Sequence, residues 1–179
     1  MAKLRHGIIG CGNISSKHMQ GYSALADRVE IYAACDLIPE RAQAIADKYG
    51  AKKTYQDYRR LLADPEVDFV SVCLPNYLHK EVSIAAMRAG KHVHCEKPMA
   101  MNYAETQEML AVQQETGRQM MVGLNNRFTP WTQFAKDYVD SGALGEVYYA
   151  KCGWMDRNML PPSGWFTDVS KAGGGALID

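Results

Sequence analysis

Short apolar runs alternate with helical stretches over the first two-thirds of the chain. The apolar runs predict strands over residues 4–9, 29–35, 53–55, 67–74, 91–95 and 119–123. The stretches between them predict helices over residues 13–26, 39–49, 57–63, 78–89 and 101–116. Alternation of this kind is typical of a parallel sheet with right-handed crossover helices. We therefore expect an α/β fold, a doubly wound parallel sheet with strand order 3-2-1-4-5-6.

The pattern changes after Gly123. Thr129 is a suitable cap for a helix over residues 130–141, with proline at its first position. Residues 146–154 form a long run of mixed polarity, which predicts a strand with one open face. A strand without a partner strand leaves its backbone groups unpaired. We therefore expect two units, residues 1–123 and 124–179, the second being the beginning of an incomplete, truncated α/β domain.

Composition and charge exclude several classes of protein. The 179 residues include 20 Lys and Arg and 20 Asp and Glu, so the formal net charge is zero. A neutral chain has no general electrostatic attraction for nucleic acid or for an anionic membrane. Hydrophobic residues make up 47% and charged residues 22%, which argues against disorder. No apolar run approaches the roughly 20 residues of a membrane span, and no signal-peptide core begins the chain.

The five cysteines point to the inside of the cell. Their number is odd and they contain no CxxC pair, whereas small secreted scaffolds show even, clustered cysteines. We expect reduced thiols in a cytoplasmic protein. Cys11, Cys35, Cys73 and Cys95 each fall at the carboxyl end of a predicted strand. A metal site is conceivable there, but small buried packing residues are the better interpretation, and we expect no metal.

A glycine-rich turn joins the first predicted strand to the first predicted helix. Gly10 and Gly12 permit a tight turn and a close approach to a pyrophosphate, and Ser15 stands at the third position of the fingerprint. Asp36 ends the second strand, where a carboxylate accepts hydrogen bonds from ribose hydroxyls and repels a 2′-phosphate. The turn therefore predicts NAD, with NADP possible. A structural strand–turn–helix and a methyltransferase site are the alternatives.

A second candidate segment, Glu96-Lys97-Pro98, directly follows the fifth predicted strand. Lys97 therefore falls at the carboxyl edge of the sheet, where open α/β sheets bind ligands. Beside a nicotinamide, its amine can hydrogen-bond a substrate hydroxyl and relay the proton while hydride moves. Taken alone the tripeptide is a weak signal, because most lysines are solvated surface charges.

In their order along the chain, these segments and several others resemble the Gfo/Idh/MocA oxidoreductases, which include glucose–fructose oxidoreductase and inositol dehydrogenases. The resemblance covers essentially the whole chain. It rests on residues 7–15, Asp36, 39–42, 64–68, 75–79, 89–98, Asn125, 127–128, Pro130 and 173–179. It implies a Rossmann domain over residues 1–123 and the start of a substrate and oligomerisation domain over residues 124–179. In such enzymes the substrate binds over the nicotinamide.

The resemblance also implies roles for individual residues. The residues that would hold the pyrophosphate are Gly10, Cys11, Gly12, Asn13 and Ile14, and Asp36 would hold the adenosine ribose. The residues that would line the cofactor crevice are Leu74, Pro75, Asn76 and His79. Glu96 and Lys97 would lie beside the nicotinamide, and Asn125 and Arg127 near the junction of the domains.

For catalysis the resemblance implies Lys97 and Asp179. Asp179 matches the aspartate of an Asp-x-x-x-His motif whose histidine would fall four positions past the last residue. His18, His92 and His94 are better interpreted as packed or surface residues, whereas His79 falls near the expected cofactor.

Aromatic residues in the second unit leave a further choice open. Trp154 and Trp165 bracket a predicted loop that, by the resemblance, faces substrate. They therefore suit a platform on which a sugar stacks, but core packing is the better interpretation.

Two functions follow as hypotheses. The first is an NAD(P)-dependent dehydrogenase that transfers a hydride between nicotinamide and a secondary alcohol of a sugar, cyclitol or similar polyol. By the resemblance, it would be a homo-oligomer at full length. The second is a truncated, catalytically incompetent dinucleotide-binding module, because hydride transfer needs a pocket that excludes water.

Overall fold

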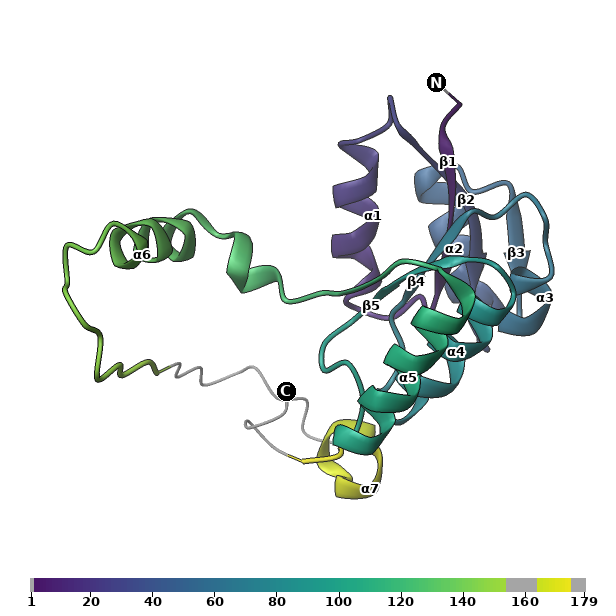
Figure 1. Cartoon of the computed structure of the whole chain (residues 1–179). Helices are drawn as coiled ribbons and strands as arrows, with labels where there is room; N and C mark the ends of the chain where they lie inside the picture. Colours follow the sequence, from purple (N-terminus) through teal and green to yellow (C-terminus); the bar gives the residue numbers. More distant parts are fainter. Residues whose placement is uncertain (1, 154–163, 175–179) are drawn as a thin grey trace.

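The computed structural model describes residues 2–153 and 164–174, and its centre is a parallel sheet of six strands (Figure 1). The strands are β1 (Leu4–Ile9), β2 (Val29–Cys35), β3 (Lys53–Tyr55), β4 (Phe69–Val72), β5 (His92–Cys95) and β6 (Met120–Val122). Their order is β3-β2-β1-β4-β5-β6, and every neighbouring pair is parallel. The strand order predicted from the sequence is therefore confirmed.

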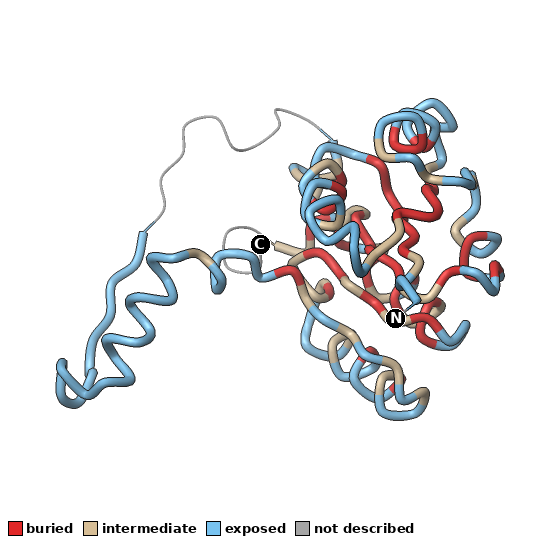
Figure 2. The backbone as a smooth tube through the Cα atoms, turned by 90° about the horizontal axis from the view of Figure 1, so that it is seen from above, coloured by how far each residue is buried: buried red, intermediate tan, exposed pale blue. Residues whose placement is uncertain are grey.

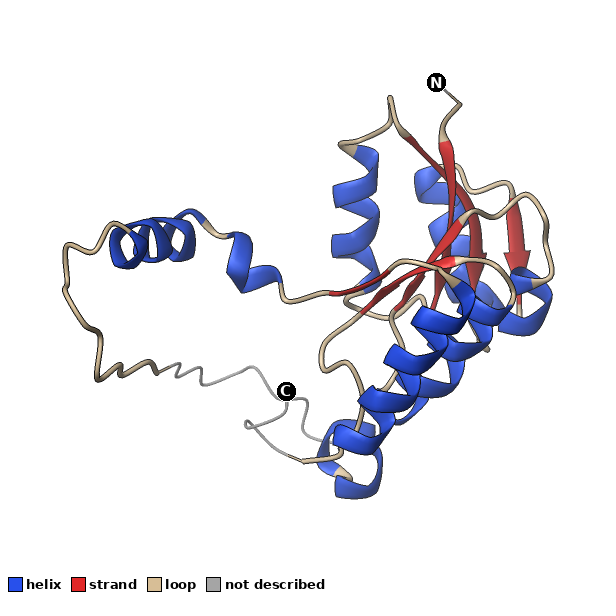
Figure 3. Ribbon diagram, in the orientation of Figure 1, coloured by secondary structure: helices blue, strands red, loops and turns tan. Residues whose placement is uncertain are grey.

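Five α-helices connect these strands (Figure 3). They are α1 (Ser15–Ser23), α2 (Pro39–Tyr49), α3 (Tyr58–Leu62), α4 (His79–Arg88) and α5 (Tyr103–Thr116), with a short 3-10 helix η1 (Asn76–Leu78) before α4. The polar caps explain where two of them begin, because the side chains of Asp57 and Asn102 accept hydrogen bonds from the first turns of α3 and α5. Gly50 ends α2 in the left-handed conformation, with φ 76°.

The sheet has an apolar core on each face. Ile9 belongs to the core that α3, α4 and α5 cover, whereas its neighbour Ile8 belongs to the core beneath α1 and α2. Adjacent residues of a strand point to opposite faces, so this one dipeptide contributes to both cores. Burial on both faces accounts for the nearly continuous apolar runs of the central strands. Figure 2 shows the buried residues concentrated along these strands.

Beside α1, the face over β4 and β5 is polar instead of apolar. We call His6, His18, Tyr22, Ser71, His94 and Glu96 the histidine cluster. His6 Nε2 lies 2.9 Å from Ser71 Oγ, and Tyr22 Oη lies 2.8 Å from His94 Nδ1. His18 Nε2 lies 2.6 Å from Glu96 Oε1. The cluster joins α1 to three strands by polar contacts where hydrophobic packing would be usual.

Burial keeps two histidines of this cluster neutral. The pKa of His94 is lowered to about 4, first by burial and then by the nearby His18. The pKa of His6 is lowered well below its ordinary value, again chiefly by burial. A proton on either ring therefore costs free energy in the folded protein.

After β6 the chain leaves the sheet. A 3-10 helix, η2 (Asn125–Phe128), leads to α6 (Pro130–Asp140), which stands apart from the sheet in Figure 1. Thr129 caps α6 as expected, since its side chain accepts a hydrogen bond from Thr132 N. Every residue of α6 is exposed, including the apolar Trp131 and Phe134. Further on, η3 (Trp165–Thr167) and α7 (Val169–Ala172) return to the sheet domain.

The strand predicted over residues 146–154 is wrong for the described part of that segment. Residues 146–153 are not in a strand, and Trp154 lies outside the described residues. A strand needs a neighbour to pair with its backbone groups, and the described residues offer none to this segment. The mixed polarity of the segment does not by itself supply a partner strand. No helix within the described ranges is long and apolar enough to cross a membrane.

The neutral histidines make stability depend on pH. In the unfolded chain His94 takes up a proton near its ordinary pKa of 6.5, but in the folded protein it does so only near pH 4. The unfolded state therefore binds more protons in this window, and the free energy of unfolding falls as the pH is lowered. From pH 7 to pH 5 we expect His94 to account for a loss of about 2 kcal/mol.

Urea denaturation at the two pH values measures this loss. His94→Gln cannot titrate, so this variant should show a clearly smaller difference between pH 7 and pH 5. An equal difference in the variant and the natural chain would contradict the assignment to His94.

Candidate cofactor site at the carboxyl edge of the sheet

The turn after β1 is held so closely that only glycine fits at position 10. Gly10 has φ 93°, and a Cβ placed on it would lie 2.3 Å from the carbonyl oxygen of Cys73, in the loop after β4. Gly10 N also donates to Cys35 O at 2.8 Å, at the end of β2. The ends of three strands therefore meet at this one residue, and it lies where the strand order reverses.

The following residues open the N-terminus of α1. Gly12, Asn13 and Ile14 are exposed, and a Cβ on Gly12 would meet no atom within 4 Å. Ser15, at the third position of the fingerprint, is buried, and its Oγ donates to Gly12 O. The first turn of α1 contains no acidic side chain. An accessible helix N-terminus with free backbone N–H groups suits a phosphate group.

Asp36 connects the end of β2 to the same turn. Its Oδ2 accepts a hydrogen bond from Cys11 N at 2.8 Å, and its Oδ1 accepts one from Ile38 N at 2.9 Å. Each carboxylate oxygen can accept more than one hydrogen bond, so this arrangement orients Asp36 and leaves acceptor capacity for ribose hydroxyls. Cys11 itself is buried, and burial together with Asp36 raises the pKa of its thiol to about 12.

The loop that carries Lys97 follows β5 at the same edge. Lys97 is partly exposed, and the peptide bond between Lys97 and Pro98 is cis. Lys97 N donates to Glu96 Oε2 at 3.2 Å. β5 pairs with β4, whose following loop approaches Gly10, so Lys97 and the glycine turn belong to neighbouring parts of one edge.

The structure gives His79 a definite set of partners. The side chain is 1% exposed at the start of α4. Its Nδ1 lies 2.7 Å from Pro98 O and its Nε2 lies 2.8 Å from Leu74 O. Both ring nitrogens therefore face backbone carbonyls, so His79 connects the loop after β4 to the loop after β5. Leu74 and Pro75, which are predicted to line the cofactor crevice, are half-buried.

Asn76 connects the site to the C-terminal segment. Its side chain is buried, and Nδ2 donates to Ala172 O at 2.9 Å. Gly173, with φ 81°, ends α7 immediately afterwards. The segment 164–174 is thus fastened to the loop after β4, next to the residues predicted to contact the cofactor.

The remaining predicted site residues are less closely associated with this edge. Asn125 and Arg127 lie exposed in η2, on the way from the sheet to α6. Asp179 lies outside the described residues. Of the sequence-predicted set, the structure brings together the glycine turn, Asp36, residues 74–76, His79, Glu96 and Lys97.

Sequence reasoning missed the pairing of His18 with Glu96, because it interpreted His18 only as packed or surface. The signal was present in the spacing. Ser15, His18 and Met19 are the buried residues of α1, and they follow the i, i+3, i+4 pattern of a buried helix face. That pattern identifies a buried histidine, which requires a polar partner.

The four strand-end cysteines are buried free thiols. Burial is the first cause that raises the pKa of Cys35 and Cys95 to about 12 and that of Cys73 well above its ordinary value. Thiols that resist ionisation are poor metal ligands. Within the described ranges, the structure shows no group of three or more His, Cys, Asp and Glu side chains suited to a metal ion.

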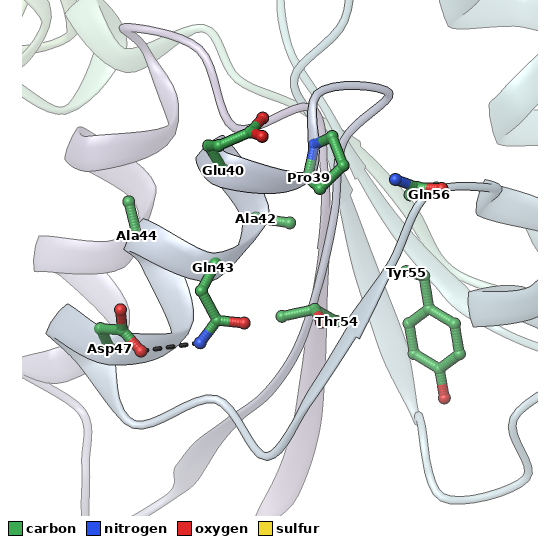
Figure 4. A pocket seen from close by; sticks show the side chains of 9 residues that line it. All are labelled: Pro39, Glu40, Ala42, Gln43, Ala44, Asp47, Thr54, Tyr55 and Gln56. Atoms are coloured by element: carbon green, nitrogen blue, oxygen red, sulfur yellow. Dashed lines mark hydrogen bonds between the residues drawn. The ribbon is translucent and has the colours of Figure 1, made fainter.

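An open hollow of about 570 Å³ lies between α2 and β3 (Figure 4). Its walls include Pro39, Gln43 and Tyr55, and the figure shows the Gln43 side chain directed to Asp47. It contains none of the residues predicted to bind the cofactor. The candidate site therefore rests on the strand-end residues and not on this hollow.

The contact of Asn76 with Ala172 leads to a prediction. Asn76→Ala removes the hydrogen bond that fastens α7, and a typical net contribution of such a bond is about 1 kcal/mol. Hydrogen exchange at Ala172 N and Gly173 N, which are bonded to Asp168 O and Val169 O, should accelerate about fivefold. The strands should keep their protection.

Asn126→Ala, at an exposed position in η2, is the matched control and should leave exchange in α7 unchanged. Unchanged protection of Ala172 in Asn76→Ala would show that other contacts dock the segment.

The chain matches two family models. Residues 4–124 match the oxidoreductase family with an NAD-binding Rossmann fold, and residues 132–179 match the GFO/IDH/MocA C-terminal domain. D-glucoside 3-dehydrogenase of Escherichia coli is 37% identical over 98% of this chain and 50% of its own length. Inositol 2-dehydrogenase of Salmonella typhimurium is 37% identical over 80% of this chain and 43% of its own. The chain thus spans about half the length of the curated relatives it matches.

Solved structures agree with these matches. An NAD binding oxidoreductase from Klebsiella pneumoniae has a TM-score of 0.83 and 34% identity, covering 99% of this chain and 50% of that one. The WlbA dehydrogenase of Bordetella pertussis, in complex with NADH and UDP-GlcNAcA, has a TM-score of 0.78 and 32% identity, covering 82% and 45%. With the doubly wound sheet and its glycine turn, these findings show that the chain belongs to the Gfo/Idh/MocA family of oxidoreductases with an NAD-binding Rossmann fold.

Proposed function

We propose that this chain binds NAD through residues 1–123 and is the front part of a dehydrogenase acting on a secondary alcohol of a sugar, cyclitol or similar polyol. Residues 124–179 begin its substrate domain. The observation that carries the proposal is the convergence at one sheet edge of an accessible helix N-terminus, the Asp36 carboxylate and Lys97. The glycine at position 10 fits this purpose, since a Cβ there would collide with the backbone after β4.

Different residues bind the pyrophosphate and the ribose of the cofactor. The backbone N–H groups of residues 12–14 and the positive end of the α1 dipole hold the pyrophosphate, while those of Gly10 and Cys11 fix the turn by their bonds to Cys35 O and Asp36. Asp36 accepts hydrogen bonds from the adenosine ribose, and its charge disfavours a 2′-phosphate, so NAD is preferred over NADP. His79 and Asn76 fix the two loops that line the crevice, by the contacts to Leu74, Pro98 and Ala172.

Bound NAD supplies a hydride acceptor at its nicotinamide ring. Lys97 then holds the substrate hydroxyl by a hydrogen bond from its amine and relays the hydroxyl proton as the alcohol becomes a carbonyl. Asp179, by family resemblance, is the second group at the reacting oxygen. The substrate class is proposed from the glucoside and inositol dehydrogenases that the chain resembles.

A second function has an observation in its favour. The apolar residues of α6 are exposed and residues 146–153 are not in a strand, so this described part of the second unit does not form a packed domain. Hydride transfer needs a site from which water is excluded. The 179 residues by themselves therefore suit a dinucleotide-binding module without turnover.

The glycine turn gives a direct test of cofactor binding. In Gly10→Ala the new Cβ would lie 2.3 Å from Cys73 O at a φ of 93°, so the turn must move. We expect the affinity for NADH, measured by fluorescence titration, to fall at least tenfold. The free energy of unfolding should fall by about 1–3 kcal/mol.

Gly21→Ala, on the exposed face of α1 where a Cβ meets nothing within 4 Å, is the control. It should keep the affinity for NADH and gain up to about 1 kcal/mol of stability from helix propensity. Equal NADH affinity in Gly10→Ala would remove the turn from the proposed site.

Lys97 separates the two proposed functions. Lys97→Ala should leave the dissociation constant for NADH within about threefold, because the amine contacts substrate and not pyrophosphate. Turnover of NAD with a panel of polyols should fall by at least about 100-fold, the usual contribution of a proton-transfer group. Lys17→Ala, at an exposed position of α1, should change neither quantity.

If the natural chain binds NADH but turns over none of the polyols, the second function stands. Undiminished turnover in Lys97→Ala would contradict the assignment of Lys97.

A further inference from the structure

The segment that carries Lys97 is held from both faces of the sheet. On the face of α4, His79 contacts Pro98 O. On the face of α1, His18 Nε2 lies 2.6 Å from Glu96 Oε1, and the two side chains are only 4% and 7% exposed. Two buried histidines from two helices thus contact the two sequence neighbours of Lys97. His18 contacts Glu96, before the lysine, and His79 contacts Pro98, after it.

One carboxylate carries the contact from α1 to Lys97. Oε1 of Glu96 is hydrogen-bonded to His18 Nε2. Oε2 of Glu96 accepts a hydrogen bond from Lys97 N, with 3.2 Å between these two atoms. Gly123 of the neighbouring segment lies close to this carboxylate, since a Cβ added to it would lie 3.2 Å from Oε1. A shift of the His18 ring is therefore passed to the main chain of Lys97.

The electrostatics fix the direction of this hydrogen bond. Burial raises the pKa of Glu96, but the hydrogen bond and charge of His18 together with Lys97 N and His94 outweigh it, so the net shift is downward. An ionised carboxylate only accepts, so His18 Nε2 carries the donated proton. His18 Nδ1 is buried without a hydrogen-bond partner among the described residues. Nε2 thus makes the only side-chain hydrogen bond of His18 there.

We propose that His18 is a positioning residue, which through Glu96 sets the place of Lys97 at the edge of the cofactor crevice. The proposal rests on the proposed function in taking Lys97 as the group that handles the substrate proton. Among the described residues, the side chain of His18 is hydrogen-bonded to Glu96, and its ring lies near the rings of Tyr22 and His94. It acts on Lys97 through two hydrogen bonds that share one carboxylate.

A purely structural role is the competing explanation. A buried ion pair can serve packing alone, and breaking it by removing one partner is destabilising whether or not it orients a neighbour. The test must therefore report on Lys97 itself and must include a variant that keeps the hydrogen bond. His18→Gln provides that variant, because its amide N–H can donate to Glu96 Oε1 from a position close to that of His18 Nε2.

The environment of Lys97 can be measured without turnover. Lysines of the 179-residue chain are reductively methylated with ¹³C-formaldehyde, and the Lys97 resonance is identified by its loss in Lys97→Arg. We expect His18→Leu to move this resonance by more than its linewidth and His18→Gln to restore it. Tyr22→Phe, four residues along α1, loses the contact to His94 but keeps His18 and Glu96, and should leave the Lys97 resonance in place.

The outcomes are distinct. An unmoved Lys97 resonance in folded His18→Leu overturns the proposal, as does an equal movement in Tyr22→Phe, which would indicate general repacking of the histidine cluster. Titration with NADH on the same samples should give dissociation constants within about threefold of each other. If NADH fails to bind at all, the proposed function fails, while the lysine resonance still decides the role of His18.

A second measurement applies if His18→Leu does not fold. Long-range ¹H–¹⁵N correlation in the natural chain reports which imidazole nitrogen carries hydrogen. A proton on Nε2 of His18 that changes its shift in Glu96→Gln supports the proposal. A ring protonated on Nδ1 alone contradicts it, because that form cannot donate to Glu96.

Discussion

The approach of Gly10 to the carbonyl of Cys73 is the contact on which the rest of the site depends. β1 and β4 are neighbours at the place where the strand order reverses, and their following loops leave toward opposite faces of the sheet. The loops can remain close only if one of them has no side chain. With that condition met, the N-terminus of α1 stays exposed and Asp36 reaches Cys11 N.

The face of the sheet beside α1 carries polar side chains, whereas this layer of an α/β core is usually apolar. An apolar layer over β4 and β5 would bury surface without any need for hydrogen bonds, whereas three histidines, a tyrosine and a glutamate require partners. Three ring nitrogens of the cluster are buried and have no hydrogen-bond partner among the described residues. They are His6 Nδ1, His18 Nδ1 and His94 Nε2. This polar layer lowers stability in acid. It also places a carboxylate next to Lys97, which an apolar layer cannot do.

Local signals in the sequence were sufficient for most of the sheet domain. Asp57, Asn102, Gly50 and Gly117 sit at helix ends for reasons that hold in any protein, and the apolar runs located the central strands. Contacts between distant segments were not accessible in this way. The pairing of His18 with Glu96 spans 78 residues, and that of Asn76 with Ala172 spans 96. Residues 146–153 have the mixed polarity of a strand with one open face, but the described residues contain no partner strand for them.

The bond between Asn76 and Ala172 has a consequence for the order of events during folding. Asn76 begins η1, directly after β4, so its position depends on the pairing of β4 with β1. Local elements form quickly, whereas a contact across 96 residues must wait for both of its ends. During synthesis the nucleotide-binding part leaves the ribosome first and can fold as a unit. The C-terminal segment can then dock on a sheet domain that is already folded, so the last contact to form joins the two ends of the described chain.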